Sequence, residues 1–341
     1  MKFARHALAS GAALSLILAA GPALARDSEE TTQSASEASE HDKLFTLFAE
    51  SDARSLALNP IGRLFRGDDT NADRLGDYFT DSMFLAARTD TQLNLALLAQ
   101  IDRAKLSETD QLAYDVFKYQ QESTLRGQSD EMRELTETRP INHFAGFHTF
   151  YPNFASGDSA AQFETIANYE DNLSRHDDYI AITDRAIARS RQGMESGVVE
   201  TRLTIDRVVK QLDTLLAVPL ADSMFMKPVK TFPEDFSAAD KARLTSAYEA
   251  KTEELYATHE RLRDFLRDDY LPVARESVGL SQMKGGEKLY AHMIEQTTTL
   301  PLTADYLHDL GLGEVARIKG ALEEIKAEVG FTGTLNEFFD Y

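Results

Sequence analysis

The chain has 341 residues, with 56 acidic against 36 basic side chains and a formal net charge of −20. Such a negative field repels nucleic acid and anionic lipid, so no nucleic-acid partner is expected. The absence of cysteine excludes disulfides, thiolate metal sites and cysteine nucleophiles. The stability of the fold therefore has to come from packing.

The first 25 residues have the features of a secretory signal peptide. Lys2 and Arg5 precede an apolar run, and residues 23–25, Ala-Leu-Ala, place small side chains before the expected cleavage site. This run is too short for a membrane-spanning helix, and no later stretch is long enough, so no membrane span is expected. After removal of the signal peptide, the protein is expected to be periplasmic or secreted.

The following residues, 26–42, are expected to form a flexible acidic tether. They are rich in Ser, Thr and Glu and carry almost no large apolar side chain, so they cannot bury enough surface to become ordered. The remainder, 43–341, is long enough to form a helical domain with a substantial core.

Apolar residues recur at helical spacing in almost every long segment of this remainder. The pattern predicts an all-α fold, a large array of long amphipathic helices. Ser107 and Asp110 form a capping pair for one helix, which Gly127 is expected to end. Further helices are expected over 163–194 with a break near Gly193 or Gly197, over 205–216 before Pro219, from Ser237 to Leu271–Pro272, and over 315–329 before Gly330.

Residues 139–157 lack this spacing and mix Pro, Asn, His, Gly and aromatic residues. Irregular loops on a rigid scaffold are where ligands usually bind. Asn142, His143 and His148 are therefore candidates for lining a substrate cleft. On the alternative interpretation the histidines only cap backbone groups, and four aromatic residues anchor the core: Phe144, Phe147, Phe150 and Phe154.

A second irregular region is expected over 285–313. Thr297 and Thr298 precede Pro301, and β-branched residues followed by a proline predict a loop. Their hydroxyl groups, with that of Tyr290, are candidates for contact with a peptide backbone. The alternative is that Thr299 or Thr303 only caps the helix that is expected to begin near Ala304.

No catalytic residue and no metal ligand can be assigned from the residues alone. A catalytic zinc needs about three protein ligands, and no H-E-x-x-H motif occurs in the chain. The one His-Glu pair, His259-Glu260, is interpreted as the solvated side of a helix, and so is the charged run 175–178. His292 and Glu295 have a spacing that suits a metal, but acidic helical proteins contain many such pairs.

Several segments resemble the bacterial domain-of-unknown-function (DUF) 885 family. They are Arg-Pro-Ile-Asn-His-Phe at 139–144, Gly-Met-Glu-Ser-Gly-Val at 193–198, Tyr-Leu-Pro-Val-Ala-Arg at 270–275, Gly-Glu-Lys-Leu-Tyr-Ala at 286–291 and Leu-Gly-Leu-Gly-Glu-Val-Ala-Arg-Ile at 310–318. The matches follow one another in the expected order over most of the chain.

Members of this family resemble exported or lipid-anchored zinc peptidases with a deep cleft between two helical halves. The resemblance implies zinc ligands in an H-E-x-x-P-G-H-H motif and a later Glu, beyond residue 341. It thus implies that this chain is the N-terminal half of a cell-envelope peptidase, forming scaffold and one wall of the peptide cleft, without a cofactor and inactive by itself. The alternative is a complete, non-catalytic periplasmic binding or interaction protein. Substrate specificity and oligomeric state stay open.

Overall fold

A computed structural model describes residues 38–341, which form one compact unit from Ser39 onward. The expected signal peptide, 1–25, lies outside the described residues, and so does most of the expected tether, 26–42. The first helix, α1 (Glu40–Leu58), begins within the tether range because Ser39 caps it, accepting a hydrogen bond from the Asp42 backbone N–H. The prediction of a flexible tether was therefore wrong for its last three residues.

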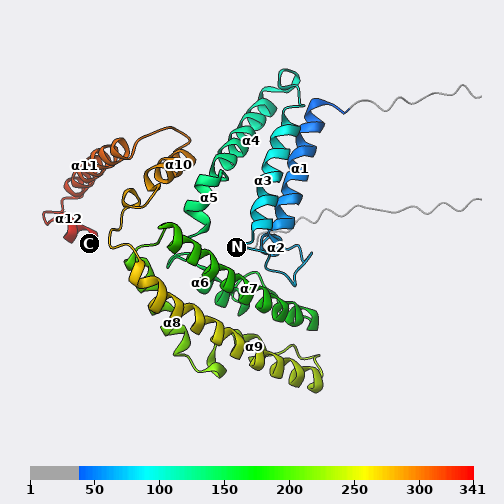
Figure 1. Cartoon of the computed structure of the whole chain (residues 1–341). Coiled ribbons are helices and arrows are strands. Elements are labelled where there is room, and N and C mark those ends of the chain that lie inside the picture. Colours follow the sequence, from blue (N-terminus) through cyan, green and yellow to red (C-terminus); the bar gives the residue numbers. More distant parts are fainter. Residues whose placement is uncertain (1–37) are drawn as a thin grey trace, which may run out of the picture. The chain divides into compact units, whose positions relative to one another are not determined.

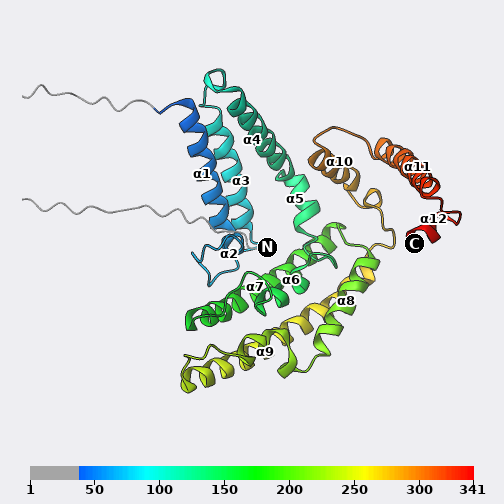
Figure 2. The ribbon, with the colours of Figure 1, turned by 180° about the vertical axis from the view of Figure 1, so that it is seen from behind.

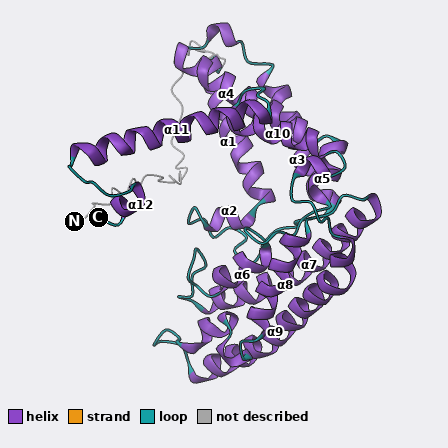
Figure 3. Cartoon of the chain, turned by 90° about the vertical axis from the view of Figure 1, so that its left-hand side faces the viewer, coloured by secondary structure: helices purple, strands orange, loops and turns teal. Residues whose placement is uncertain are grey.

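The described part of the chain is helical, as the sequence predicts (Figure 3). An isolated parallel bridge between Thr201 and Arg275 is the β-type contact found within residues 38–341. No helix in that range combines the length and apolar character that crossing a membrane demands.

After α1 the helices are α2 (Pro60–Leu64), α3 (Asp81–Leu98), α4 (Glu108–Gly127), α5 (Asp130–Glu137), α6 (Phe147–Ala155), α7 (Ile166–Ser196), α8 (Arg202–Leu216), α9 (Ala238–Asp264), α10 (Gly286–Thr298), α11 (Ala304–Glu328) and α12 (Leu335–Phe339).

Helices α1, α3 and α4 pack side by side (Figure 1). Ser107 caps α4 as predicted, with its side chain accepting from the Asp110 backbone N–H. The apolar faces of the three helices bury a cluster that includes Leu44, Leu47 and Leu98. A polar contact across the group links α1 to α3, where Arg54 Nη2 donates to Asn94 Oδ1 at 2.6 Å.

Helices α7 and α9 pack along each other, and α8 packs on α9 (Figure 2). The buried face of α8 carries Ile205, Val208 and Leu212, which matches the apolar stripe in the sequence. α6 lies against α7 and contributes Tyr151 and Phe154 to a second buried cluster. Helices α6, α7, α8 and α9 together position the loop before α6, which contains the predicted cleft residues.

The end of α9 is irregular. A π-helical turn, Phe265–Tyr270, follows the α-helix and leads into a short 3-10 turn, Leu271–Val273. The Tyr270 hydroxyl then accepts the backbone N–H of Glu200 at 2.8 Å. The Glu200 carbonyl in turn accepts the backbone N–H of Arg275 at 2.9 Å. These bonds attach the exit of α9 to the segment between α7 and α8.

The helix boundaries confirm one expectation and correct two. α7 passes through Gly193 and ends at Gly197, whose φ of 78° suits a left-handed C-cap, so the second of the two expected break points is the right one. α6 occupies part of the region 139–157, and α10 occupies part of the region 285–313, both of which were expected to be irregular. Thr297 and Thr298 are therefore in a helix, and the prediction of a loop at these two residues was wrong.

Candidate functional site

A side-chain turn at Asn142 shapes the loop before α6. Asn142 Oδ1 accepts hydrogen bonds from the backbone N–H groups of Phe144, at 3.0 Å, and Ala145, at 2.8 Å. Phe144 is 90% exposed, so the expectation that it anchors the core was wrong. Phe154, by contrast, is fully buried. The loop thus presents one aromatic side chain to solvent at a position that its own hydrogen bonds define.

Gln211 of α8 holds both loop histidines. Its Nε2 donates to the His143 carbonyl oxygen, and its Oε1 lies 2.9 Å from His148 Nε2. Because an amide oxygen can only accept, His148 carries its proton on Nε2. Arg207 Nη1 donates to His143 Nε2 at 3.1 Å, which places the proton of that ring on Nδ1. Asn142, His143 and His148 are therefore brought together against α8.

Sequence reasoning missed Gln211 and Arg207. They lie on the polar side of α8, where the apolar stripe gives no reason to prefer one polar residue over another. The amphipathic pattern of α8 indicates which side of the helix is buried, and it gives no signal for hydrogen-bond partners on the polar side.

Replacing Gln211 with alanine is expected to loosen this loop and to cost about 2 kcal/mol of unfolding free energy. The variant removes two hydrogen bonds and leaves the His148 Nε2–H buried without an acceptor. Hydrogen exchange of the Phe144 and Ala145 amides should accelerate. Lys210→Ala removes an exposed side chain from the same helix and serves as control. Equal exchange in both variants would contradict this role of Gln211.

Buried histidines and tyrosines lie behind His148. Tyr179 Oη is 2.8 Å from His259 Nε2, and Tyr151 Oη is 2.7 Å from His176 Nδ1. The two tyrosine rings stack with centroids 4.3 Å apart. Burial lowers the pKa of His176 and of His259 to about 3, and it also lowers the pKa of His148. The three histidine rings are therefore neutral at pH 7. Because they carry no charge, their hydrogen-bonded network with the tyrosines can be buried as part of the core.

A cavity of about 20 Å³ lies beside His148 and Tyr179, with Ile182 and Leu262 among its lining residues. This volume has room for roughly one water molecule. The space is too small for a peptide, so substrate contact at this site would have to use the outer surface of the loop and of α8.

Two sequence interpretations are corrected by this network. His259 is fully buried and does not belong to the solvated side of α9, although Glu260 is exposed. In the charged run 175–178, Arg175 and His176 are buried as well. The Arg175 guanidinium donates to Asn172 Oδ1 at 3.2 Å and to the carbonyl of Ala72. Hydrogen bonding from distant segments makes this burial possible, and the periodicity of one helix cannot reveal it.

The remaining candidate residues lie on α10. Tyr290 is half exposed, while the hydroxyl groups of Thr297 and Thr298 donate to carbonyls one turn earlier in the same helix, at 2.8 and 2.7 Å. Between these residues and the Asn142 turn, no hydrogen bond is found in the described range 38–341. Glu295, expected as one half of a possible metal pair, instead binds Arg126 Nη2 at 3.0 Å.

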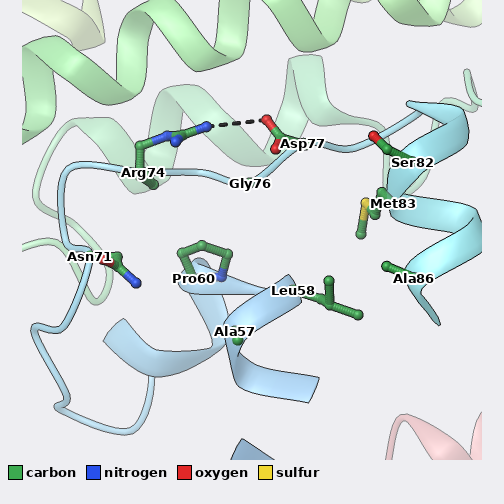
Figure 4. A pocket seen from close by; sticks show the side chains of 10 residues that line it. All are labelled: Ala57, Leu58, Pro60, Asn71, Arg74, Gly76, Asp77, Ser82, Met83 and Ala86. Atoms are coloured by element: carbon green, nitrogen blue, oxygen red, sulfur yellow. Dashed lines mark hydrogen bonds and ion pairs between the residues drawn. The ribbon is translucent and has the colours of Figure 1, made fainter. Parts of the chain in front are cut away.

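A larger hollow of about 370 Å³ lies between the end of α1, the start of α2, the start of α3 and the segment that joins α2 to α3 (Figure 4). Sequence reasoning selected none of its residues. Its charged side chain Arg74 donates to Asp77 at 3.1 Å and to Asp178 at 2.8 Å. The guanidinium is thus engaged by carboxylates of the chain itself, and the hollow offers no unpaired charge to orient a ligand.

A zinc ion is the cofactor that the resemblance implies for the longer protein. Among the His, Asp and Glu side chains of residues 38–341, no three gather closely enough to hold a metal ion. His308 and Asp309 are exposed on α11. The described residues do not fit a zinc site, so no hydrolytic step is assigned to them.

Comparisons with known proteins give a family and a similar fold. Residues 60–341 match the model of the family described as "Bacterial protein of unknown function (DUF885)". A solved structure, described as "the putative lipoprotein from Colwellia psychrerythraea", has a similar fold with a TM-score of 0.69 and 15% identity. The match covers 88% of this chain and 53% of that protein, so this chain spans about half of its length. A comparison with curated proteins gives no match.

Proposed function

Because the chain belongs to the bacterial DUF885 family, we propose that it is the N-terminal helical part of a zinc-dependent, peptidase-like protein of the cell envelope. In this proposal its helices are the scaffold and one wall of a peptide cleft. The metal ligands come from another part of the longer protein. This chain then binds and positions the substrate and carries out no bond cleavage itself.

The observation that carries the proposal is the surface made by the Asn142 turn and α8. Exposed Phe144 follows His143, which Arg207 contacts from the helix. An aromatic ring can pack on an apolar side chain of a peptide, and a guanidinium can bind its carbonyl oxygens or terminal carboxylate. The high negative charge of the chain favours neutral or cationic peptides over acidic ones.

The length of the similar solved structure also supports the proposal. This fold occupies 53% of that protein, so in at least one case it is joined to nearly as much chain again. A protein that binds its substrate on one half and holds its hydrolytic centre on the other needs a second half of this kind. Clefts between two parts of a protein are common places for substrate sites.

Peptide binding tests the wall directly. Fluorescence anisotropy with labelled, uncharged and cationic peptides should show binding to residues 26–341, and Arg207→Ala should weaken it about tenfold because a charge-assisted hydrogen bond is lost. Lys210→Ala removes one positive charge from the same helix and should leave the affinity unchanged. If Arg207→Ala and Lys210→Ala bind the peptides with equal affinity, the peptide-binding surface lies elsewhere on the chain.

Two observations separate this proposal from a non-catalytic binding protein. The coding DNA after Tyr341 should continue and encode an H-E-x-x-P-G-H-H motif; a stop codon at that point would favour the binding protein. The isolated chain supplied with zinc should release no product from peptides. Chelator-sensitive turnover by the isolated chain would contradict the assignment of the metal ligands to another segment.

A further inference from the structure

A pocket of about 340 Å³ lies between α9 and the segment that joins α8 to α9 (Figure 2). That segment contains two short 3-10 helices, Leu220–Asp222 and Met224–Lys230, which pack on α9. This space, the Thr252 pocket, shares no lining residue with the Asn142 turn or with α8. It is therefore separate from the surface that is proposed to bind peptides.

The apolar side of the Thr252 pocket is fixed by packing. The Tyr256 hydroxyl of α9 donates to the carbonyl oxygen of Val218 at 2.9 Å, and Phe225 is 1% exposed. Met226 and Val229, which line the pocket, are buried as well. These contacts hold the joining segment against α9, so the pocket is a preformed part of the fold.

Thr252 lines the pocket with a hydroxyl group that has no partner. The residue is 1% exposed, and its Oγ1 makes no hydrogen bond within residues 38–341. Thr245 and Thr258 on the same helix each donate to the carbonyl oxygen four residues earlier, at 2.8 Å. The Thr252 hydroxyl does not make this bond. Because a buried hydroxyl is costly without a partner, a polar group bound in the pocket would satisfy it.

Exposed charged side chains at the rim of the pocket have no ion-pair partner. Glu249 and Glu253 lie one turn apart on α9, and neither pairs with a basic group in the described part of the chain. Glu254, by contrast, pairs with Lys251 at 2.7 Å. Lys230, on the joining segment, likewise has no acidic partner within residues 38–341. The rim thus offers two free carboxylates and one free ammonium group.

We propose that the Thr252 pocket binds a free amino acid with an apolar side chain, such as leucine or methionine. The ammonium group of this ligand pairs with Glu249 and Glu253, and its carboxylate pairs with Lys230. Its side chain packs on the apolar side of the pocket. The Thr252 hydroxyl forms a hydrogen bond with one of the two charged groups. This inference does not depend on the proposed function.

The size of the pocket fits a single amino acid. Its volume of about 340 Å³ would hold roughly ten water molecules, at about 30 Å³ each. Leucine and methionine have a similar number of non-hydrogen atoms. A peptide of several residues would exceed this volume, so the pocket is suited to the free amino acid.

The charges at the rim argue against ligands that carry only one kind of charge. An organic cation would pair with the two carboxylates but would lie beside the free ammonium group of Lys230. An organic anion would meet both carboxylates and a chain whose net charge is −20. A ligand with both charges can pair with the free carboxylates and with the free ammonium group at once.

Isothermal titration calorimetry of residues 26–341 with L-leucine tests the proposal. Isoamylamine is leucine without its carboxylate, and isocaproate is leucine without its ammonium group. Each should bind about tenfold more weakly than leucine, because one charge-assisted pair is lost. Binding of either compound as tight as that of leucine would overturn the proposal, and so would the absence of leucine binding at millimolar concentration.

Thr252→Val replaces the hydroxyl group with a methyl group of similar size. Because this hydroxyl has no partner within residues 38–341, the midpoint of thermal unfolding should not fall, whereas leucine affinity should fall about tenfold. Thr258→Val makes the same change on the same helix, where the hydroxyl bonds to the Glu254 carbonyl and lies outside the pocket. It should leave leucine affinity unchanged.

Glu253→Gln and Glu254→Gln are a second matched pair. Glu253 lines the pocket and Glu254 does not, so leucine binding should weaken about tenfold in the first variant and stay unchanged in the second. Equal leucine affinity of Thr252→Val, Glu253→Gln and the unmodified chain would overturn the proposal.

Arg207→Ala separates this site from the proposed peptide-binding surface. Arg207 does not line the pocket, so this variant should bind leucine like the unmodified chain even where it loses affinity for peptides. Loss of leucine binding in Arg207→Ala would contradict a separate amino-acid site. Peptide binding that is unchanged in Arg207→Ala would instead contradict the proposed function and leave the amino-acid site intact.

Discussion

Acidification from pH 7 to about 4.5 is expected to remove about 5 kcal/mol of unfolding free energy. The reason is burial of His176 and His259, which lowers the pKa of both rings from 6.5 to about 3. Between these values the unfolded chain binds protons that the folded chain does not. The free energy that the two neutral histidines contribute to folding is therefore fully present above about pH 6.5, and it is lost as the pH falls toward 3. Arg175 beside His176 strengthens the penalty for a second positive charge.

Urea unfolding at several pH values between 7 and 4.5 measures this loss. Each histidine should contribute about 1.4 kcal/mol per pH unit below its unfolded pKa. His259→Gln keeps a polar partner for Tyr179 but cannot titrate, so it should reduce the slope by about half. His308→Gln changes an exposed histidine of α11 and is the matched control. An unchanged slope in the His259 variant would show that this buried ring does not govern acid unfolding.

Gly193→Ala is expected to destabilise the fold by about 3 kcal/mol. A Cβ at this position would lie 2.6 Å from the Val198 carbonyl oxygen and 2.7 Å from that of Thr138. Both obstacles are backbone atoms, so no side-chain rotation can relieve the overlap. The midpoint of thermal unfolding should fall by several degrees.

Gly320→Ala is the control for that substitution. It makes the same chemical change inside another helix, where nothing lies within 4 Å. Helix propensity alone then favours alanine by about 1 kcal/mol, so the midpoint should not fall. If Gly193→Ala is as well tolerated as Gly320→Ala, the close approach of α7 to the two carbonyls is not important for stability.

The helical class and most long helices could be predicted because their signals are local. Ser107 caps α4, Gly197 ends α7, and the stripe through Ile205, Val208 and Leu212 is the buried face of α8. α6 was missed because it is short and contains Pro152. A helix around His292 and Glu295 was expected, but its end was placed too early, because β-branched threonines before a proline indicate a loop. In the structure the Thr297 and Thr298 hydroxyls bond to carbonyls of α10 itself.

The candidate site was predictable only in part. The composition of the loop around Asn142 identified Asn142, His143 and His148, but their partners Gln211 and Arg207 are more than sixty residues away in the sequence. The burial of His259 depends on Tyr179 of another helix in the same way. Long-range pairing of polar groups leaves no periodic trace in a single sequence, so the solvated and buried histidines could not be told apart.

The π-helical turn at Phe265–Tyr270 makes the chain length at this point critical. Its wider hydrogen bonding accommodates one residue more than an α-helical turn, and it keeps Phe265 and Tyr270 buried together. A deletion of one residue here would let the turn become regular, but it would shift Arg275 out of register with Glu200. Segments that join helices usually tolerate changes in length. This one should be among the least tolerant of insertions and deletions.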